Sequence, residues 1–412
     1  MIQAPRGTQD VYGEDIKIWH HIESCIREIT ATFNFGEIRV PIIENTELFL
    51  RGVGETTDVV QKEMYTFEDK GGRSISLRPE LTAGAVRAYI ERGLHNRPQP
   101  TKLWYFGPNF RYERPQEGRF RQHNQFGVEI FGASGAAAEA EVISIGRELL
   151  KKIGVRGFDI CINSIGCPDC RKVYHENLKN FLGERIEELC GLCKTRFEKN
   201  PLRVLDCKTP SCGEIVANVP SVLDSLGDEC AAHFAELQTL LTRMEIPFRV
   251  DPKIVRGLDY YTRTVFEFIA PNLPTVIGGG RYDGLISQIG GTATPAVGFG
   301  MGIERLVILL KNENAAPQST DAPDIFIGAM GAEGAAKSHE LAYRLRTAGI
   351  RAESDLLGRS VKAQMKFADK INARFTMVIG ESELAQGAAN VKNMQTGEAT
   401  GVDFDGLAKI FI

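Results

Sequence analysis

The stretch LWYFGPNFRYERPQEGRFRQHNQFGVEIFG, residues Leu103–Gly132, decides how the rest of the chain is interpreted. Aromatic and β-branched residues dominate its two ends, and glycine and proline interrupt its middle. This pattern is typical of two antiparallel strands joined by a long loop. The loop and the strand ends beside it hold more cationic than acidic side chains: Arg111, Arg114, Arg119, Arg121 and His123, against Glu113 and Glu117.

Two interpretations of this loop are open from the stretch alone. An arginine at a strand end, followed by further arginines, suits a phosphate, because the guanidinium fork matches two phosphate oxygens at once. The plainer interpretation is a charged hairpin at a solvated sheet edge. Other parts of the chain have to decide between the two.

Length and composition indicate an ordinary globular protein. The 412 residues are enough for roughly two or three domains with a large buried core. Hydrophobic residues make up 43% and charged residues 25%, and the net charge of -4 gives no overall basic field, so any nucleic acid has to be held by local patches. The N-terminal residues contain no apolar signal core, and no apolar run approaches the ~18 residues that span a bilayer. We therefore expect a cytoplasmic protein with no membrane segment.

The N-terminal region predicts a helix followed by an unusual strand. Residues Glu14–Phe35 show the apolar period of an amphipathic helix. The next segment, GEIRVPIIE (Gly36–Glu44), has strand composition, but Pro41 cannot donate a ladder hydrogen bond. We expect a strand at a sheet edge or interface, and a proline at the end of an ordinary strand is an equally good interpretation. A second copy of the chain would cover such an edge, which predicts a homodimer.

A hairpin and a helix should follow. Met64–Glu68 and Arg73–Arg78 predict the hairpin, and LRPELTAGAVRAYIERG predicts a helix that begins at Glu80 and stops near Gly93. Negative charge is favoured in the first helical turn, which fully explains Glu80. The alternative is that Glu80 and Thr82 contact a cationic group of a ligand.

The middle of the chain changes character twice. The region 166–245 is rich in helix-forming segments and lacks strand patterns, so we expect an inserted helical domain. Strand character returns around RGLDYYTRTVFEF, which holds one cation, one anion and two phenols within six residues: Arg256, Asp259, Tyr260 and Tyr261. The glycines of VIGGGRYDGL (Gly278–Gly280) predict a turn whose backbone approaches a ligand or takes positive φ. They fit neither a dinucleotide fingerprint nor a Walker-type phosphate loop.

The segment AVGFGMGIERLVILLKN (Ala296–Asn312) predicts a strand that runs into a helix. Gly298, Gly300 and Gly302 leave one face of that strand bare, so a flat group could lie against it. Arg305 falls in the first helical turn, where a cation opposes the helix dipole. A residue that breaks a local rule is a candidate for function.

The C-terminal region predicts a separate domain. Asn312–Pro323 has linker composition, and Asp324–Ile412 alternates strands and helices as in a small α/β domain with a largely parallel sheet. Cations spaced along one predicted helix form a candidate footprint for nucleic-acid phosphates, with a solvated helix face as the alternative. These cations are Lys362, Lys366 and Lys370 on the helix, with Arg359 just before it.

Seven of the nine cysteines lie between Cys161 and Cys212. In a long chain without a signal peptide, such clustering favours metal binding or reduced thiols over disulfides. Two C-x2-C pairs separated by 19 residues have the spacing of a four-cysteine structural zinc site. The predicted Zn2+ ligands are Cys167, Cys170, Cys190 and Cys193, with Cys207 and Cys212 left as spare thiols; thiols without metal are the alternative.

Taken together, these segments resemble a known family. EIRVPIIE, the hairpin with FRYE, and the glycine-rich strand entering a helix at GIERL resemble, in order, the three signature motifs of class II aminoacyl-tRNA synthetases. Within that class, LRPELTA, the opening hairpin and RGLDYYTRTVFEF resemble the histidyl-tRNA synthetases. NPLRVLDCK (Asn200–Lys208) is similar to the insertion of the bacterial members, and the resemblance covers nearly the whole chain.

The resemblance implies a fold. We expect an α+β catalytic domain, residues 1–165 and 246–315, whose antiparallel class II synthetase sheet is flanked by helices. A helical insertion at 166–245, a linker at 316–323 and a C-terminal α/β anticodon-binding domain at 324–412 complete the expectation.

The resemblance also implies an activity. L-histidine is adenylated by ATP with release of pyrophosphate, and the histidyl group then passes to tRNA(His); Mg2+ is expected with ATP. Both steps disperse phosphate charge, so positioned cations matter more than a protein nucleophile. Arg111 and Arg256 would be the catalytic cations at the α-phosphate, and Arg305 would hold the γ-phosphate. The full set expected to bind ATP is Arg111, Glu113, His123 and Arg305.

For histidine, the resemblance places the α-ammonium at Glu80, Thr82 and Gln125, and the imidazole between Glu129 and Tyr261. Imidazole has a nitrogen on each side, so its recognition needs a partner at both ends. Glu129 follows Gln125 by four residues, and even spacing on a strand puts both on one face. The full predicted set is Glu80, Leu81, Thr82, Gln125, Glu129, Tyr260 and Tyr261.

Two positions depart from the family pattern. Leu81 stands where relatives often carry glycine, and His123 stands where the family usually places an aromatic residue that stacks on adenine. One rival interpretation is a non-catalytic paralogue of this fold that binds histidine and regulates its biosynthesis; it would be expected to lose the phosphate-binding arginines or the C-terminal domain, and this chain keeps both. A pure RNA-binding module is the other rival, and the pocket-like clustering of charges around RGLDYY argues against it.

Overall fold

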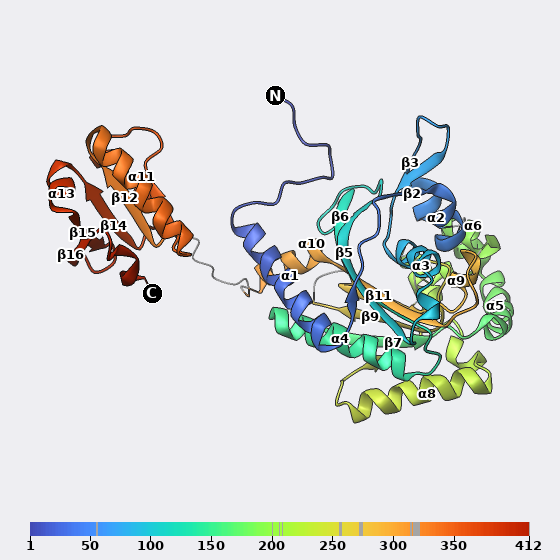
Figure 1. The fold of residues 1–412 in the computed structure, drawn as a ribbon. Coiled ribbons are helices and arrows are strands. Elements are labelled where there is room, and N and C mark those ends of the chain that lie inside the picture. The colour runs from blue at the N-terminus through green and yellow to red at the C-terminus, as the bar shows by residue number, and fades with distance from the viewer. Residues whose placement is uncertain are drawn as a thin grey trace. The chain divides into compact units, whose positions relative to one another are not determined.

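The computed structural model describes residues 1–54, 57–199, 201–205, 207, 209–254, 258–271, 275–313, 315 and 322–411 (Figure 1). The chain divides into two compact units, Met1–Pro317 and Gln318–Ile412. Each unit is described by itself below.

An eight-stranded sheet organises the first unit, in the order β1-β5-β6-β11-β10-β9-β7-β8. Its neighbours pair antiparallel, except that the edge strands β1 and β8 run parallel to β5 and β7. The predicted antiparallel sheet is therefore confirmed. Its strands are β1 (Gly36–Glu37), β5 (Thr101–Phe110), β6 (Gln122–Phe131), β7 (Asp159–Ser164), β8 (Arg249–Val250), β9 (Thr262–Ile269), β10 (Ile277–Arg281) and β11 (Ala296–Gly302).

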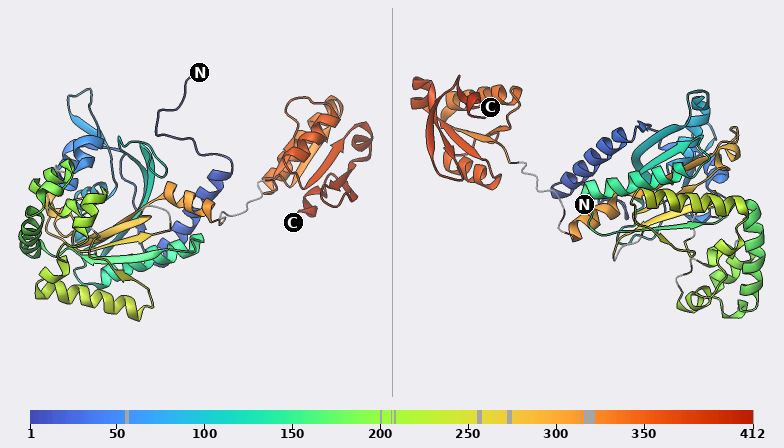
Figure 2. Two further views of the ribbon diagram at one scale, coloured as in Figure 1. Left: turned by 180° about the vertical axis from the view of Figure 1, so that it is seen from behind. Right: turned by 90° about the horizontal axis from the view of Figure 1, so that it is seen from below.

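Helices cover both faces of this sheet (Figures 1 and 2). Strand alternation sends Phe126, Val128 and Ile130 of β6 into one apolar core, while Phe131 points into a second core on the opposite face. The first core is shared with α1 (Glu14–Thr32), α4 (Ala137–Ile153), α8 (Asp228–Arg243) and α10 (Ile303–Asn312). The second core is shared with α3 (Thr82–Glu91) and α9 (Leu285–Gln288), and α2 (Thr46–Val53) packs beside them.

The predicted strand Gly36–Glu44 is divided in the structure. Its ends form β1 and β2 (Ile43–Asn45), and β2 joins β4 (Ser74–Leu77) and β3 (Tyr65–Glu68) in a three-stranded antiparallel sheet. Pro41 lies in the break between them. There the Arg78 guanidinium donates to the carbonyl oxygens of Val40 at 2.6 Å and Pro41 at 3.1 Å, so a side chain replaces the ladder bonds that a proline-containing segment lacks.

The glycines Gly278–Gly280 lie inside strand β10, so the predicted turn is wrong. None of the three has a positive φ. The glycines are needed because neighbouring strands leave no space: a Cβ on Gly279 would collide with the carbonyl oxygen of Gly298, and one on Gly280 with that of Thr264.

The predicted insertion is helical in the structure. It contains α5 (Pro168–Gly183), α6 (Gly191–Lys199) and α7 (Pro210–Val216), with short 3-10 segments between them, and it leads into α8. The green helices α5 and α6 lie at one end of the large sheet in Figures 1 and 2. Its apolar core draws its buried members only from residues between Tyr174 and Val222.

The second unit is a small α/β domain, as predicted. Its sheet has the order β13-β12-β14-β15-β16, with β12 parallel to both β13 and β14 and the last two strands antiparallel. In the described parts of both units, no helix is long and apolar enough to cross a membrane. The elements are β12 (Ile325–Ala329), α11 (Gly331–Thr347), β13 (Ala352–Ser354), α12 (Val361–Lys370), β14 (Phe375–Ile379), α13 (Glu381–Gln386), β15 (Ala388–Asn393) and β16 (Ala399–Asp403).

A buried ion pair ties the large sheet to its covering helices. Arg281 of β10 is fully buried and donates to both carboxylate oxygens of Glu139 on α4, at 2.7 and 2.5 Å. His233 of α8 lies 2.6 Å from the same carboxylate. Burial favours the protonated acid, but the hydrogen bonds from Arg281 and His233 outweigh it and lower the pKa of Glu139.

We expect Arg281→Met to destabilise the first unit strongly, because it leaves the buried Glu139 carboxylate without its main partner. Breaking a buried pair in this way costs about 3–5 kcal/mol in the free energy of unfolding. The control is Lys172→Met, which removes an ion pair with Asp169 whose side chains are 77% and 87% exposed, and it should cost less than about 1 kcal/mol. Urea denaturation measures both variants, and similar small losses would contradict the assigned weight of the buried pair.

Candidate active site

The centre of the candidate site is the buried carboxylate of Glu129 on β6, which is 1% exposed. The hydroxyl of Tyr105 donates to its Oε1 at 2.7 Å, and the hydroxyl of Tyr282 donates to its Oε2. Burial raises the pKa of Glu129 to about 8, while hydrogen bonds from Tyr282, Tyr105 and Thr82 act to lower it. A carboxyl group in this setting is an acceptor held ready for a donor.

Glycines of β11 make room for this carboxylate. Gly298 pairs with Glu129 across the sheet, and a Cβ there would collide with the Glu129 carboxylate. Two residues along, a Cβ on Gly300 would collide with the amide of Gln125. The strand face that the sequence leaves bare is thus filled by the side chains of Glu129 and Gln125, which lie on the same side of β6 as predicted.

Glu80 lies beside this pocket and caps a helix. Its carboxylate accepts from the backbone N–H groups of Thr82 and Ala83, each at 2.7 Å, and α3 begins at Thr82 rather than at Glu80. Burial raises the pKa of Glu80. The Thr82 hydroxyl lies 3.1 Å from that of Tyr105 and so links the helix start to Glu129.

Aromatic rings form the adjoining wall. The ring of Tyr260 lies 4.7 Å from that of Tyr261 and 5.5 Å from that of Tyr282, and all three side chains are buried. Burial, together with the charges of Tyr261, Glu80, Glu129 and Tyr105, raises the pKa of Tyr260 well above its ordinary value. Arg256, predicted nearby, lies outside the described residues.

Three polar residues of the pocket were not predicted from the sequence: Tyr105, Tyr282 and Asn109. Tyr105 pairs with Gly127, where a side chain would collide with the tyrosine ring, so a glycine opposite an aromatic residue was the available signal. Asn109 donates to Gln125 Oε1 at 2.6 Å, and its own Oδ1 is buried without a hydrogen-bond partner among the described residues. A ligand N–H group would satisfy that oxygen.

Arginines occupy the other end of the hairpin. Arg111 donates to the Pro79 carbonyl at 2.8 Å, which places it next to the Glu80 loop, and its Nη1 lies 3.9 Å from Glu113. Oε2 of Glu113 is also buried without a hydrogen-bond partner in the described part of the chain.

Arg305 reaches the same region from α10. It donates to the carbonyls of Gly118, in the hairpin loop, at 3.1 Å and of Thr275 at 2.7 Å. Burial, with the charges of Arg111 and Arg305 acting in the same direction, lowers the pKa of His123 to about 3. His123 is therefore a neutral ring between two cations, and the structure brings the four predicted phosphate-end residues together.

Leu81 has a packing role in the structure. It is buried in an apolar cluster with Val40, Ala85, Ala88 and Tyr105. Its predicted contact with the amino acid stays a prediction.

Three of the four predicted cations of the second unit lie on α12, and Arg359 lies just before it. Lys362, Lys366 and Lys370 are exposed, while Gln364 and Ala368 of the same helix are buried. Arg359 differs from the lysines. It is paired with Asp355 at 2.9 Å and stacks on Phe367 at 4.2 Å.

The predicted zinc ligands do not form one site, which is a correction. Cys190 and Cys193 lie with Cys207 and Cys212, the supposed spare thiols, whereas Cys167 and Cys170 lie with Cys230. The spacing of the C-x2-C pairs suited one site, but the pairs open two different helices, α5 and α6.

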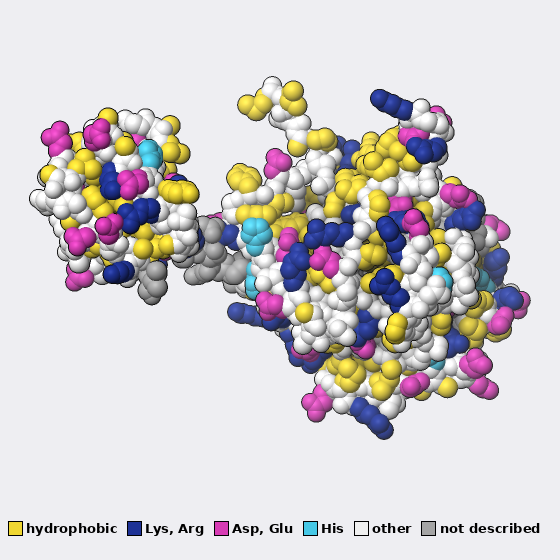
Figure 3. Space-filling view, in the orientation of Figure 1, with side chains coloured by type: hydrophobic (Ala, Val, Ile, Leu, Met, Phe, Trp, Pro, Cys, Tyr) yellow, Lys and Arg dark blue, Asp and Glu magenta, His cyan; other side chains and the backbone are white. Residues whose placement is uncertain are grey.

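The two ends of the hairpin differ in chemistry. One end offers buried carboxyl, hydroxyl and amide groups, and the other offers the guanidinium groups of Arg111 and Arg305, which backbone carbonyls hold in place. Lys and Arg side chains also gather near the middle of the face of this unit seen in Figure 3, interspersed with Asp and Glu. The arrangement suits a ligand with N–H groups at one end and phosphates at the other.

We expect the contribution of Glu129 to the stability of the ligand-free protein to fall as pH rises from the ordinary carboxyl value of 4.5 toward about 8, because folded Glu129 keeps a proton that the unfolded chain releases. Glu80 and Glu304, whose pKa values burial also raises, act in the same direction, and His123, whose pKa is lowered, acts in the opposite direction below about 6.5. Glu129→Gln removes only its own share, so the loss across this window should be smaller in the variant. Denaturation midpoints at both ends of the window measure it, and parallel losses in the two proteins would contradict the buried-acid assignment.

Comparison with known proteins agrees with this geometry. The family model described as histidyl-tRNA synthetase matches residues 7–172 and 186–306, and the anticodon binding domain model matches 324–412. The chain is 52% identical to histidine--tRNA ligase of Caldanaerobacter subterraneus subsp. tengcongensis (99% of both chains) and of Clostridium botulinum (100% of this chain, 99% of the other). The crystal structure of apo S. aureus histidyl-tRNA synthetase is 40% identical, with a TM-score of 0.84 and full coverage of both chains. The chain belongs to the histidyl-tRNA synthetase family.

Proposed function

We propose that the protein ligates L-histidine to tRNA(His) through a histidyl-adenylate, consuming ATP and releasing AMP and pyrophosphate. The observation that carries the proposal is the single hairpin β5–β6, which joins the buried Glu129 pocket to Arg111 and His123. An amino acid in the pocket and a nucleotide at the arginines would meet on this hairpin.

In the first step, a carboxylate oxygen of histidine attacks the α-phosphorus of ATP and pyrophosphate leaves. Arg111 is close enough to Glu80 for its charge to act on that carboxyl, which supports its role at the meeting point of carboxylate and α-phosphate. Arg305 would hold the γ-phosphate, and Arg256 stays predicted as the second α-phosphate cation. Fixed cations at the reacting phosphate lower the barrier by stabilising developing charge without reorganisation.

The polar groups of the pocket suggest how histidine would be recognised. An imidazole N–H would donate to Glu129, and Tyr260 and Tyr261 would line the ring. The α-ammonium would bind at Glu80, Thr82 and Gln125, and the buried Oδ1 of Asn109 supports a donor at this end. Amino acids without a matching ring N–H would not make this hydrogen bond to Glu129, which disfavours them.

ATP brings Mg2+ as its companion ion. A hard cation takes oxygen ligands, and the carboxylate of Glu113, which lies 3.9 Å from Arg111 and 3.6 Å from Arg119, would be the candidate ligand at this end of the hairpin. Bound there, the ion would neutralise charge on the departing pyrophosphate. The neutral ring of His123 would contact the nucleotide beside it.

For the tRNA, we propose residues 324–412 as the anticodon-binding domain, with Lys362, Lys366, Lys370 and Arg359 on its phosphate-binding side. Residues 1–165 and 246–315 would form the catalytic domain, 166–245 the insertion and 316–323 the linker. The exposure of the three lysines supports their part in this proposal, because counterion release requires accessible charge.

A homodimer is part of the proposal, as is a cytoplasmic location. Three apolar side chains around the three-stranded sheet are exposed: Ile42 at 41%, Ile43 at 52% and Phe67 at 45%. Strand β1 is an edge strand of the large sheet. A second copy would cover both. Sedimentation equilibrium of the purified chain tests this part.

The alternative is a regulatory paralogue that binds histidine without adenylating it. It is less supported, since the arginine end of the hairpin and the C-terminal domain are both kept. Histidine-dependent exchange of labelled pyrophosphate into ATP distinguishes the two, because a purely regulatory protein binds histidine and exchanges nothing.

We expect the wild-type protein to catalyse this exchange and Arg111→Ala to lose at least about 100-fold, since removing one fixed donor at a developing charge costs on that order. Arg156→Ala, an exposed arginine of the loop before β7, is the matched control and should exchange like wild type. Full exchange in Arg111→Ala would remove the central role assignment, and no exchange by wild type would refute the synthetase proposal.

A further inference from the structure

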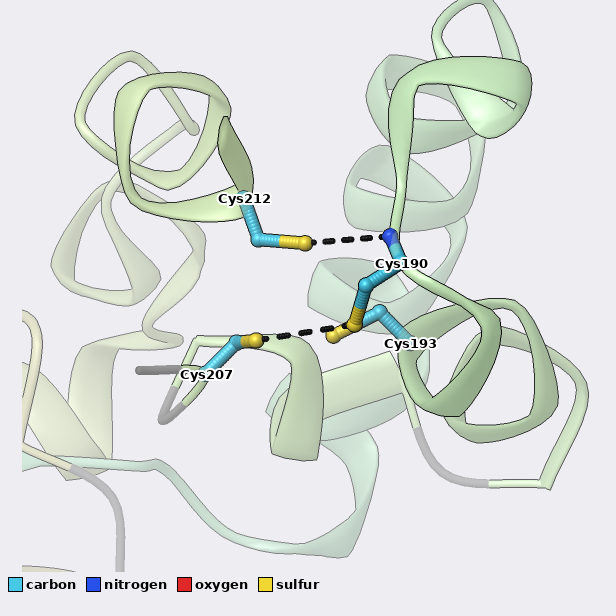
Figure 4. Close-up of side chains that lie close together, drawn as sticks. All are labelled: Cys190, Cys193, Cys207 and Cys212. Atoms are coloured by element: carbon cyan, nitrogen blue, oxygen red, sulfur yellow. Dashed lines mark hydrogen bonds between the residues drawn. The ribbon is translucent and has the colours of Figure 1, made fainter. Parts of the chain in front are cut away.

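Four cysteines of the insertion converge on one point, outside the site described above. The sulfur atoms of Cys190, Cys193, Cys207 and Cys212 all lie within 4.8 Å of one another. Figure 4 shows these four side chains close together. Cys193 and Cys212 are fully buried, while Cys190 and Cys207 are half-buried. We propose that these four cysteines bind a structural Zn2+ ion.

The distances suit a metal rather than a disulfide. Cys190 Sγ lies 3.9 Å from Cys207 Sγ, and sulfurs bonded to Zn2+ at about 2.3 Å in a tetrahedron lie about 3.8 Å apart. All nine cysteines are free thiols. The two pairs, C-x2-C at 190–193 and C-x4-C at 207–212, both have zinc-ligand spacing.

Backbone amides already point at the sulfurs. The N–H of Cys190 donates to Cys212 Sγ at 3.2 Å, and the N–H of Thr209 donates to Cys207 Sγ at 3.5 Å. Thiolates are the form that metals bind, and a cation lets buried thiols reach it.

The donor set selects the metal. Four soft thiolates in tetrahedral arrangement fit Zn2+ or iron, and no oxygen donor belongs to the group, so Mg2+ and Ca2+ are excluded. With four protein ligands no coordination position stays open, which makes the ion structural.

In this proposal the ion stabilises the fold of the insertion. Its core is small, drawn from residues between Tyr174 and Val222, and two of the cysteines belong to it. A core of this size rarely stabilises a fold without a staple. The ion would join the start of α6 to the start of α7, and α6 also carries Arg196, whose guanidinium lies 4.0 Å from Asp58 of the catalytic part.

The cluster Cys167, Cys170 and Cys230 provides a control from the same chain. Among the described residues it offers three ligands and no fourth, so it carries no metal in this proposal. Cys167 and Cys207 are both half-buried, so serine at either position disturbs packing to a similar extent.

The test is the zinc content of the full-length protein, purified without chelator or metal-affinity column and analysed by mass spectrometry of metals. We expect about one zinc per chain in wild type and in Cys167→Ser, and less than about 0.2 in Cys207→Ser. Zinc below about 0.2 in wild type, zinc lost in Cys167→Ser but kept in Cys207→Ser, or iron in place of zinc would each overturn the proposal.

Two further measurements keep the test independent of folding failure and of the proposed activity. Exchange of wild-type zinc for Co2+ should give the visible absorption of a tetrahedral four-thiolate site, and a spectrum of an octahedral oxygen-ligated ion would overturn the ligand assignment. Removing the metal from wild type should open the segment between α5 and α7 to trypsin while the catalytic sheet stays resistant. Unchanged protection of that segment would overturn the structural role, whatever the pyrophosphate exchange shows.

Discussion

A carboxyl group buried inside a sheet requires hydrogen-bond partners, and several strands of the fold supply them to Glu129. The hydroxyl groups of Tyr105 and Tyr282 bond its two oxygens, and Gly298 gives up its side chain to leave space. These residues come from β5, the end of β10 and β11, so the strand order of the central sheet is what assembles the pocket. Burial raises the pKa of Glu129. Burial also removes water from this carboxyl, so that a donor on a bound ligand would be its additional hydrogen-bond partner.

The arginine end of the hairpin follows the opposite logic. Arg111 and Arg305 are held by backbone carbonyls, so their positive charges are positioned but not neutralised by those contacts. His123 between them is kept neutral by burial and by the two cations. In the proposed function, the phosphates of ATP would lie at this end of the hairpin, where the two guanidinium groups are held in place.

Local patterns predicted most of the elements, and long-range pairing explains what they missed. The hairpin, the helices, the shared side of Gln125 and Glu129, and the C-terminal α/β domain follow from periodicity and turn residues. Tyr105 and Tyr282 could not be assigned, because their contact with Glu129 depends on which strands become neighbours. The run Gly278–Gly280 was predicted as a turn for the same reason. The sequence alone does not distinguish a glycine that makes room for a neighbouring strand from a glycine in a turn. The cysteine spacing likewise allowed one site, and only the packing of α5 and α6 separates the pairs.

The central claim is that Glu129 accepts a hydrogen bond from the imidazole ring of histidine. The most direct test is to measure the affinity for L-histidine of wild type and Glu129→Gln by isothermal titration calorimetry. The NH2 group of Gln cannot accept a hydrogen bond, so the variant cannot keep the bonds from both Tyr105 and Tyr282. A buried polar group left unsatisfied costs about 1–3 kcal/mol, so we predict at least about fivefold weaker histidine binding in the variant with unchanged ATP binding. Glu236→Gln, on the exposed side of α8, should bind histidine like wild type. Equal histidine affinity in wild type and Glu129→Gln would contradict the account.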